Sequence, residues 1–299
     1  MSFILPLSLT YSGTYTLRKI RRGVCTGERT IHNLILTSGY DLIGSSSDCF
    51  IKQCFVGTGE TPPTLADTTL ETLMASSDVQ DNTGSNSVIT SPTRYNRYLV
   101  TFTFTAGSIT APITEIGCGV SSTSLFSRAL LLDSSGVIAP LEILSDESLE
   151  VIYELRANLP DGDVTGTFSS FNNATQLTTN ILITIRVAQI TNSLQIQFGL
   201  RKSSSAKINL YDGDIRAETT IPGGSAAGEA TLDPSTYVAG QFDTTFSYNY
   251  SYSYANWATG IKAFTMKTTQ CFYQIGLSAP IIKGSRDYMK FALTIYWGP

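Results

Sequence analysis

The sequence predicts an all-β fold of antiparallel β-sandwich or jelly-roll-like domains, with one or two short helices near the N-terminus. Two observations support this prediction. Apolar residues alternate with polar residues along many short segments, as they do in strands that bury one face. Clusters of Gly, Ser, Asn, Asp and Pro separate these segments at short intervals, which is typical of sandwiches and barrels.

The alternation is clearest in five segments, each of which places its apolar side chains on one face of a strand. These segments are residues 100–104, 149–155, 181–185, 194–200 and 289–297. The last of them ends two residues before the final residue, so we expect the C-terminus to be tied into a sheet.

Two other segments favour short helices. Residues 33–43 place four aliphatic side chains on roughly one helical face, and residues 63–76, which start at the second proline of Pro62-Pro63, carry three leucines and a methionine. A cluster of Pro, Gly and Asp at 159–166 predicts a boundary between an N-terminal β domain (1–160), with an extended arm and the helices, and a C-terminal β-sandwich domain (161–299). The alternative is one large sandwich whose strands are exchanged across that turn.

The N-terminal nine residues are apolar and precede the first basic residues, Arg18, Lys19, Arg21 and Arg22, which is the reverse of a signal peptide. We therefore expect a strand or an arm running into a basic turn, and an arm could pair with neighbouring copies by strand addition. No stretch reaches the ~18 apolar residues of a membrane-spanning helix, so membrane insertion is not expected.

Five widely spaced cysteines fit neither a disulfide framework nor a zinc motif, and we expect buried thiols at Cys118 and Cys271 in a reducing cytosol. Charged residues make up 15% of the chain, against the usual figure of about 25%. A net charge of −4 provides no basic surface for a phosphate backbone, so nucleic acid is not an expected partner.

Residues that could carry chemistry are few, and we predict no catalytic, cofactor-binding or metal-binding residues. The single histidine, His32, stands at the start of a predicted helix and suits a cap or surface role. Asp161-Gly-Asp163 and Asp212-Gly-Asp214 resemble hairpin turns more than calcium loops. Glu150 and Glu154 share a strand face opposite an apolar row, which predicts solvated carboxylates. The chain is therefore not expected to be an enzyme.

One conspicuous row of aromatic residues alternates with Ser and Asn near the C-terminal end of the sequence. On a strand, this spacing places the rings along one face. The row belongs to the core or to an inter-subunit face in one interpretation, and forms a sugar- or receptor-binding platform in the other. Its members are Phe246, Tyr248, Tyr250, Tyr252 and Tyr254, followed by Trp257.

Several segments together resemble tailed-bacteriophage virion proteins of the tail, collar and fibre-attachment kind. The segments are NLILTSGYDLIG (33–44), FVGTGETPP (55–63), DTTL (67–70), YLVTFTF (98–104) and ITEIGCG (113–119). With LEVIYELR (149–156), DVTG (163–166) and the terminal LTIYWG (293–298), the resemblance covers most of residues 30–166 and the final strand, whereas residues 200–260 are not matched.

The resemblance implies a structural subunit of the virion, located in the neck or collar, the tail or the baseplate. Such a subunit assembles as a symmetric oligomer in the cytoplasm of the bacterial host, and its partners are copies of itself and other virion proteins such as fibres. The alternative function is a receptor- or glycan-binding tail tip or fibre protein that mediates adsorption to a host surface glycan. No catalytic residues accompany the resemblance.

Overall fold

The computed structural model consists almost entirely of strands, which confirms the all-β prediction. One α-helix, α1 (Thr37–Ser45), lies in the part of the chain that the structure describes. No helix in that part is long and apolar enough to cross a membrane. The structure describes residues 3–45, 51–81, 85–90, 93–172, 177–188, 207–218, 220–231, 233–250, 253–267, 272–287 and 289–299.

The strands form two sheets. The larger has 13 strands: β1 (Phe3–Arg21), β2 (Val24–His32), β3 (Leu34–Ile35), β4 (Gln53–Gly57), β5 (Leu73–Asp81), β6 (Ser85–Thr90), β7 (Thr93–Phe104), β8 (Glu115–Ser121), β9 (Ser124–Leu130), β10 (Ser148–Asn158), β15 (Asp233–Pro234), β16 (Asp243–Tyr250) and β19 (Met289–Trp297). The smaller has six: β11 (Val164–Asn172), β12 (Leu177–Val187), β13 (Lys207–Tyr211), β14 (Ala226–Thr231), β17 (Ile261–Lys267) and β18 (Phe272–Ile281).

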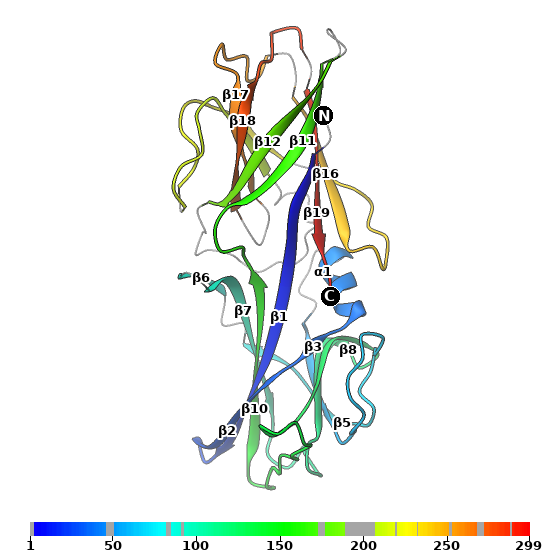
Figure 1. Ribbon diagram of the computed structural model, residues 1–299. Coiled ribbons are helices and arrows are strands. Elements are labelled where there is room, and N and C mark those ends of the chain that lie inside the picture. Colours follow the sequence, from blue (N-terminus) through cyan, green and yellow to red (C-terminus); the bar gives the residue numbers. More distant parts are fainter. Residues whose placement is uncertain are drawn as a thin grey trace.

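The molecule is elongated, and β1 runs along much of its length (Figure 1). From Thr10 to Ile20, β1 pairs antiparallel with β10. From Thr14 to Arg21 it also pairs with β2, which must lie on its opposite edge. The first residues of β1 pair parallel with β19, the last strand of the chain. The expected tying of the C-terminus into a sheet is therefore present.

The N-terminal segment Phe3–Arg21 is a strand of the sheet, which agrees with the expected strand and not with the alternative of an extended arm. Both edges of β1 are paired within the chain between Thr14 and Ile20, so this stretch has no edge left for strand addition to a neighbouring copy. The predicted basic turn is present between β1 and β2. Its residues Arg22 and Gly23 have φ values of 52° and 77°, as a two-residue hairpin turn with two left-handed positions requires.

Alternation along the strands produces the core. In β10, Leu149, Val151, Tyr153 and Leu155 are fully buried, while the residues between them are partly exposed. β12 repeats the pattern over the predicted segment 181–185. One hydrophobic cluster contains buried residues of both sheets, and the Tyr250 hydroxyl of β16 donates to the carbonyl oxygen of Ile208 in β13 at 3.3 Å. The predicted strand at 194–200 lies outside the described residues.

Of the two predicted helices, one is present. The helix expected over 33–43 is α1, which begins later, at Thr37, because Leu34 and Ile35 pair with β9. The helix expected over 63–76 is wrong: the segment is a turn followed by β5. Its backbone amides bind carboxylates of this and neighbouring segments, and those contacts outweigh the local helical spacing.

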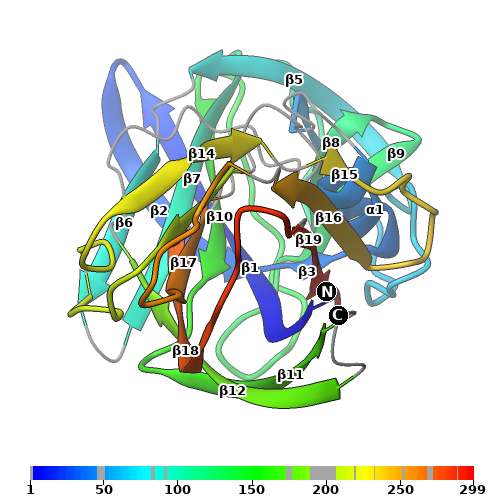
Figure 2. The ribbon, with the colours of Figure 1, turned by 90° about the horizontal axis from the view of Figure 1, so that it is seen from above.

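The large sheet crosses the boundary expected at 159–166. That segment is the connection between β10 and β11, but β16 and β19, which follow it in sequence, join the sheet of β1. Figure 2 shows β16 and β19 beside β1, with β11 and β12 along another side. Arg94 of β7 adds an ionic link across the boundary, 3.1 Å from Asp161 and 2.5 Å from Glu218.

The end of the chain also packs against α1 (Figure 1). Trp297 is 3% exposed, and its indole Nε1 donates to the carbonyl oxygen of Tyr40 at 3.0 Å. The Tyr237 ring stacks on Trp297 with 6.3 Å between ring centroids. Asp41 of α1 accepts a hydrogen bond from the amide of Gly240 at 2.9 Å and another from the hydroxyl of Tyr237.

Candidate functional site

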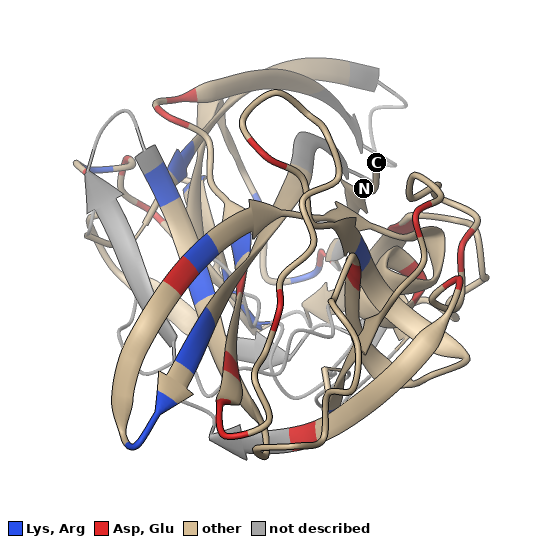
Figure 3. Ribbon diagram, turned by 90° about the horizontal axis from the view of Figure 1, so that it is seen from below, with Lys and Arg blue, Asp and Glu red and all other residues tan. Residues whose placement is uncertain are grey.

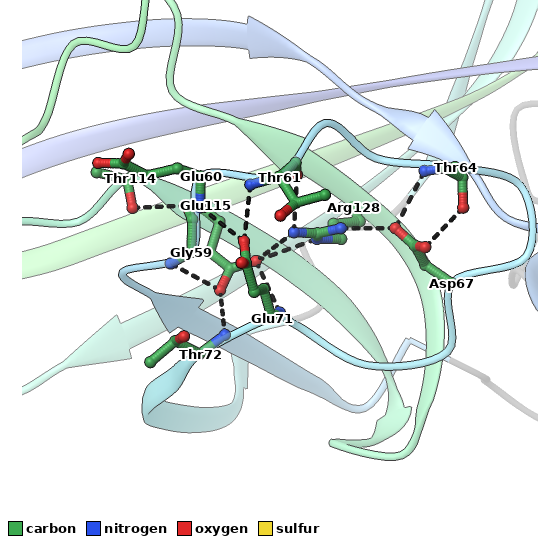
Figure 4. A network of polar contacts seen from close by, with 10 residues as sticks. All are labelled: Gly59, Glu60, Thr61, Thr64, Asp67, Glu71, Thr72, Thr114, Glu115 and Arg128. Atoms are coloured by element: carbon green, nitrogen blue, oxygen red, sulfur yellow. Dashed lines mark hydrogen bonds and ion pairs between the residues drawn. The ribbon is translucent and has the colours of Figure 1, made fainter.

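The most elaborate polar arrangement in the described residues holds the loop 58–72, which connects β4 to β5 (Figure 4). Glu115, the first residue of β8, lies beneath this loop and is fully buried. An isolated carboxylate at such a depth would be costly, so its surroundings must compensate for the lost hydration. The donors around Glu115 show how this is done.

Five hydrogen bonds converge on the Glu115 carboxylate (Figure 4). Oε1 accepts from the amides of Gly59 at 3.0 Å and Thr72 at 2.7 Å. Oε2 accepts from the amide of Glu71 at 3.1 Å and from Nε and Nη2 of Arg128 at 3.0 and 2.8 Å. The carboxylate thereby fastens both ends of the loop 58–72 to the sheet.

Arg128, in the middle of β9, is the cationic centre of the arrangement and is 3% exposed. Besides binding Glu115, its Nη1 donates to Asp67 at 2.6 Å and its Nη2 to the carbonyl oxygen of Thr61 at 3.0 Å. The two carboxylates raise the pKa of the guanidinium against the opposing effect of burial. A planar guanidinium suits this role because its donors point in fixed directions toward several acceptors.

Further hydrogen bonds shape the exposed part of the loop. Glu71 accepts from the amides of Glu60 at 2.8 Å and Thr61 at 2.7 Å. Asp67 accepts from the amide and the hydroxyl of Thr64 at 3.0 and 2.6 Å. Each acidic side chain thus closes a local turn of the backbone.

Gly59 is required at its position by close packing. A Cβ atom there would lie 2.5 Å from Glu115 Oε1 and 2.5 Å from Glu71 Cβ, which is closer than non-bonded atoms approach. Any side chain would therefore push the loop away from the carboxylate.

The geometry suits a carboxylate that holds the loop in place, and not one that takes part in a reaction. A carboxylate offers about four lone-pair sites, and five donors already occupy those of Glu115. Proton abstraction or metal binding would require these donors to leave. What the arrangement provides is a surface loop in one fixed conformation, in which Leu65 is 39% exposed; Leu73, which begins β5 directly after the loop, is 49% exposed.

Acid should loosen this loop. Hydrogen bonds from Thr64 and Arg128 outweigh burial and lower the pKa of Asp67, and hydrogen bonds from Thr61 and Glu60 lower the pKa of Glu71. Groups with depressed pKa values stabilise the fold above their unfolded values, about 3.9 for Asp and 4.3 for Glu, and this stability is lost as the pH falls through the folded values.

We therefore expect the urea concentration at half-unfolding to decrease as the pH is lowered from 6 to 3. Asp67→Asn should lower this midpoint at pH 6 and make it depend less steeply on pH. Glu142→Gln, which changes an exposed carboxylate elsewhere, is the control and should keep the wild-type slope. An Asp67→Asn protein with the wild-type slope would contradict this assignment.

The rings of the aromatic row predicted from the sequence differ in burial. Phe246 and Tyr250 are 0% and 2% exposed, so the core interpretation holds for these two rings. Tyr248 is partly buried against the core and meets Tyr250 edge-to-face at 4.9 Å. Tyr254 is 50% exposed and lies 6.4 Å from Tyr250, whereas Tyr252 falls outside the described residues. Trp257 is partly buried against the core cluster.

The other sequence candidates lie apart from the loop 58–72. His32 ends β2 on the surface, so it is not a helix cap. Glu150 and Glu154 are on the outer face of β10, near Arg18 and Arg97 respectively. Both Asp-Gly-Asp segments are turns or bends, and Asp163 binds Arg186 at 2.6 Å.

The expected buried thiol at Cys118 is confirmed. Cys118 of β8 pairs in register with Cys54 of β4, and both side chains are fully buried. Burial raises the pKa of the Cys54 thiol well above its ordinary value. Cys271 lies outside the described residues.

Sequence reasoning missed the roles of Glu115 and Arg128. The signal that could have found them is a charged residue inside an apolar strand: Glu115 within ITEIG and Arg128 within LFSRALL. Charges at such positions are almost always paired when they are buried.

Comparison with known proteins finds no match among protein-family models, curated proteins or solved structures.

Proposed function

We propose that this protein is a structural subunit of a tailed-bacteriophage virion, placed in the neck or collar, the tail or the baseplate. In this role it assembles as a symmetric oligomer in the bacterial cytoplasm and connects or anchors other virion proteins such as fibres. The observation that carries the proposal is the loop 58–72, a surface loop fixed by a buried ion pair.

The loop supports an assembly role for an energetic reason. A flexible loop loses conformational freedom on binding, and this loss weakens association, whereas a loop already held in its bound shape avoids it. Glu115 and Arg128 hold the loop 58–72 in this way. Segments 55–63 and 67–70, which include much of the loop, and segment 113–119, which contains Glu115, are among those that resemble phage virion proteins.

The sparse charge of the chain favours the same role. Figure 3 shows that acidic and basic residues are scattered along the ribbon and that most of it consists of uncharged residues. Charged groups cost free energy when an interface removes them from water, so a subunit surrounded by neighbours benefits from having few. Large aliphatic side chains also reach the solvent on the smaller sheet and its loops, with Leu182 62% and Ile282 65% exposed.

A glycan- or receptor-binding tip built on the aromatic row has weaker support. Phe246 and Tyr250 cannot stack on a ligand while they remain in the core. Such a platform would rest on Tyr254 and the partly buried Tyr248 and Trp257.

Assembly can be tested by light scattering on the purified protein. We expect wild-type protein to form a symmetric oligomer and Leu182→Glu to shift it toward the monomer, because a charge at an aliphatic contact must be desolvated. Val137→Glu alters a side chain that is 60% exposed in a loop outside the smaller sheet, and should leave assembly unchanged. Wild-type protein that stays monomeric at about 100 µM, well above a micromolar dissociation constant, would contradict the oligomer.

The place in the virion requires a separate experiment. A gold-labelled antibody against the protein should mark one level of the neck, tail or baseplate in electron micrographs of phage particles. Particles that carry no label, although the antibody recognises the denatured protein from the same infected cells, would exclude a virion subunit.

A further inference from the structure

A polar trough runs along the outer face of β1, between β2 and β10, with a volume of about 370 Å³. It lies apart from the loop 58–72 and from the aromatic row. Its floor is formed by small residues of β1, and its walls by residues of the two neighbouring strands. The lining residues are Ser12, Gly13, Thr14, Thr16, Thr30, His32, Glu154 and Arg156.

Strand register explains why the surface is hollow here. Thr14 stands directly between His32 of β2 and Glu154 of β10, so a short side chain lies between two longer ones. Ser12 is likewise opposite Arg156 of β10. Because neighbouring strands are about 4.8 Å apart, the two walls are separated by roughly twice that distance, enough for one six-membered ring.

Ion pairs hold the walls in place. Arg18 lies farther along β1 and bridges the two neighbouring strands, 2.7 Å from Glu28 of β2 and 3.4 Å from Glu150 of β10. The guanidinium of Arg156 lies 4.2 Å above the ring centroid of Tyr95 and also binds Glu154. A site whose side chains are already positioned loses less entropy when a ligand arrives.

The lining groups match a polyhydroxylated ligand. Four hydroxyls line the trough, and those of Thr16 and Thr30 already bond each other at 3.1 Å. The Glu154 carboxylate, 14% exposed, accepts from Arg156 and lies 3.6 Å from Arg97, so it offers a ligand only its exposed edge, whereas the Arg156 guanidinium is 37% exposed and donates. The opposite charges of Glu154 and Arg156 balance each other, so the lining does not favour a strongly charged ligand. We infer that the trough is a carbohydrate site for one neutral sugar ring, with sugar hydroxyls bound by Thr14, Glu154 and Arg156. This binding role goes beyond the proposed structural function and does not depend on it.

The experiment measures binding of the intact protein to immobilised oligosaccharides ending in glucose, galactose, mannose, N-acetylglucosamine or glucuronate. We expect at least one of the four neutral sugars to bind and glucuronate to bind more weakly. Thr14→Val keeps the shape and removes one hydroxyl, so affinity should fall about two- to tenfold, the effect of one hydrogen bond. Thr14→Tyr fills the trough and should abolish binding.

Thr101→Val is the matched control, because Thr101 lies on β7, which pairs with the other edge of β10, and does not line the trough. It should leave affinity unchanged, and thermal melting should show that both Thr14 variants stay folded, since valine and tyrosine favour strands. The proposal is overturned if no neutral sugar binds, if glucuronate binds best, or if Thr14→Tyr binds as well as Thr101→Val. The oligomer is scored separately by light scattering, so failure of either idea leaves the other standing.

Discussion

Replacing Glu115 with alanine is expected to lower the free energy of unfolding by about 3–5 kcal/mol, the effect of leaving a buried charge without its partner. Arg128, which is 3% exposed, would still bind Asp67, but two of its N–H donors would lose their acceptor. The amides of Gly59, Glu71 and Thr72 would lose their acceptor as well. Urea denaturation of the two proteins measures the difference.

An exposed ion pair of the same chemical type supplies the control. Glu150 binds Arg18 at 3.4 Å, but the two side chains are 32% and 39% exposed. Water therefore screens the pair, and Glu150→Ala should cost no more than about 1 kcal/mol. If Glu115→Ala costs no more than this control, the network does not hold the loop in the way described.

Hydrogen exchange locates the damage. In Glu115→Ala protein, the amides of Gly59 and Thr72 should exchange faster, because the carboxylate oxygen that accepts from both is gone. Amides in the middle of β10, which are bonded to neighbouring strands, should change only as far as global stability does.

The second large effect is expected where the last strand meets α1. Trp297→Ala should lower the free energy of unfolding by about 3–5 kcal/mol, as for other buried aromatic residues cut back to alanine. The ring is almost fully buried, contacts Tyr237 and donates to Tyr40, so both packing and a hydrogen bond are lost. Thermal or urea denaturation provides the measurement.

Gly44→Ala tests the same contact from the helix. In an ordinary helix this change is stabilising by about 1 kcal/mol. Here the new Cβ would lie 2.4 Å from Tyr237 Cε2 and 2.5 Å from Trp297 Cζ2, so we expect a loss of about 1–3 kcal/mol from overpacking. The sign of the change in the free energy of unfolding therefore shows whether α1 and Trp297 are tightly packed. Tyr296→Ala, at a ring 39% exposed in the same strand, is the control.

Most strands could be predicted from the sequence because alternation is a local property. The predicted segments 100–104, 149–155, 181–185 and 289–297 all fall within strands, namely β7, β10, β12 and β19. Helical spacing was less reliable. Residues 63–76 have the leucines of a helix, but Asp67 and Glu71 bind backbone amides in turns, and the segment wraps around Arg128.

The candidate site was visible in the sequence only in fragments. The glycines at 57 and 59 and the acidic residue at 115 stood in separate segments, and nothing in the sequence alone joined them. Arg128, which completes the ion pair, comes from yet another strand. A buried ion pair needs side chains from two segments, so it can be recognised only when the fold brings those segments together.

Amphipathic strands with little charge can be inferred from local sequence, because side-chain alternation and turn residues act within a few positions. Which strands pair is seen first in the folded chain. β1 joins β10, β2 and β19, the first and last strands lie side by side, and the loop 58–72 closes over Glu115. Pairing depends on non-local contacts whose free energy appears only when distant segments meet, and local sequence patterns leave those partners open.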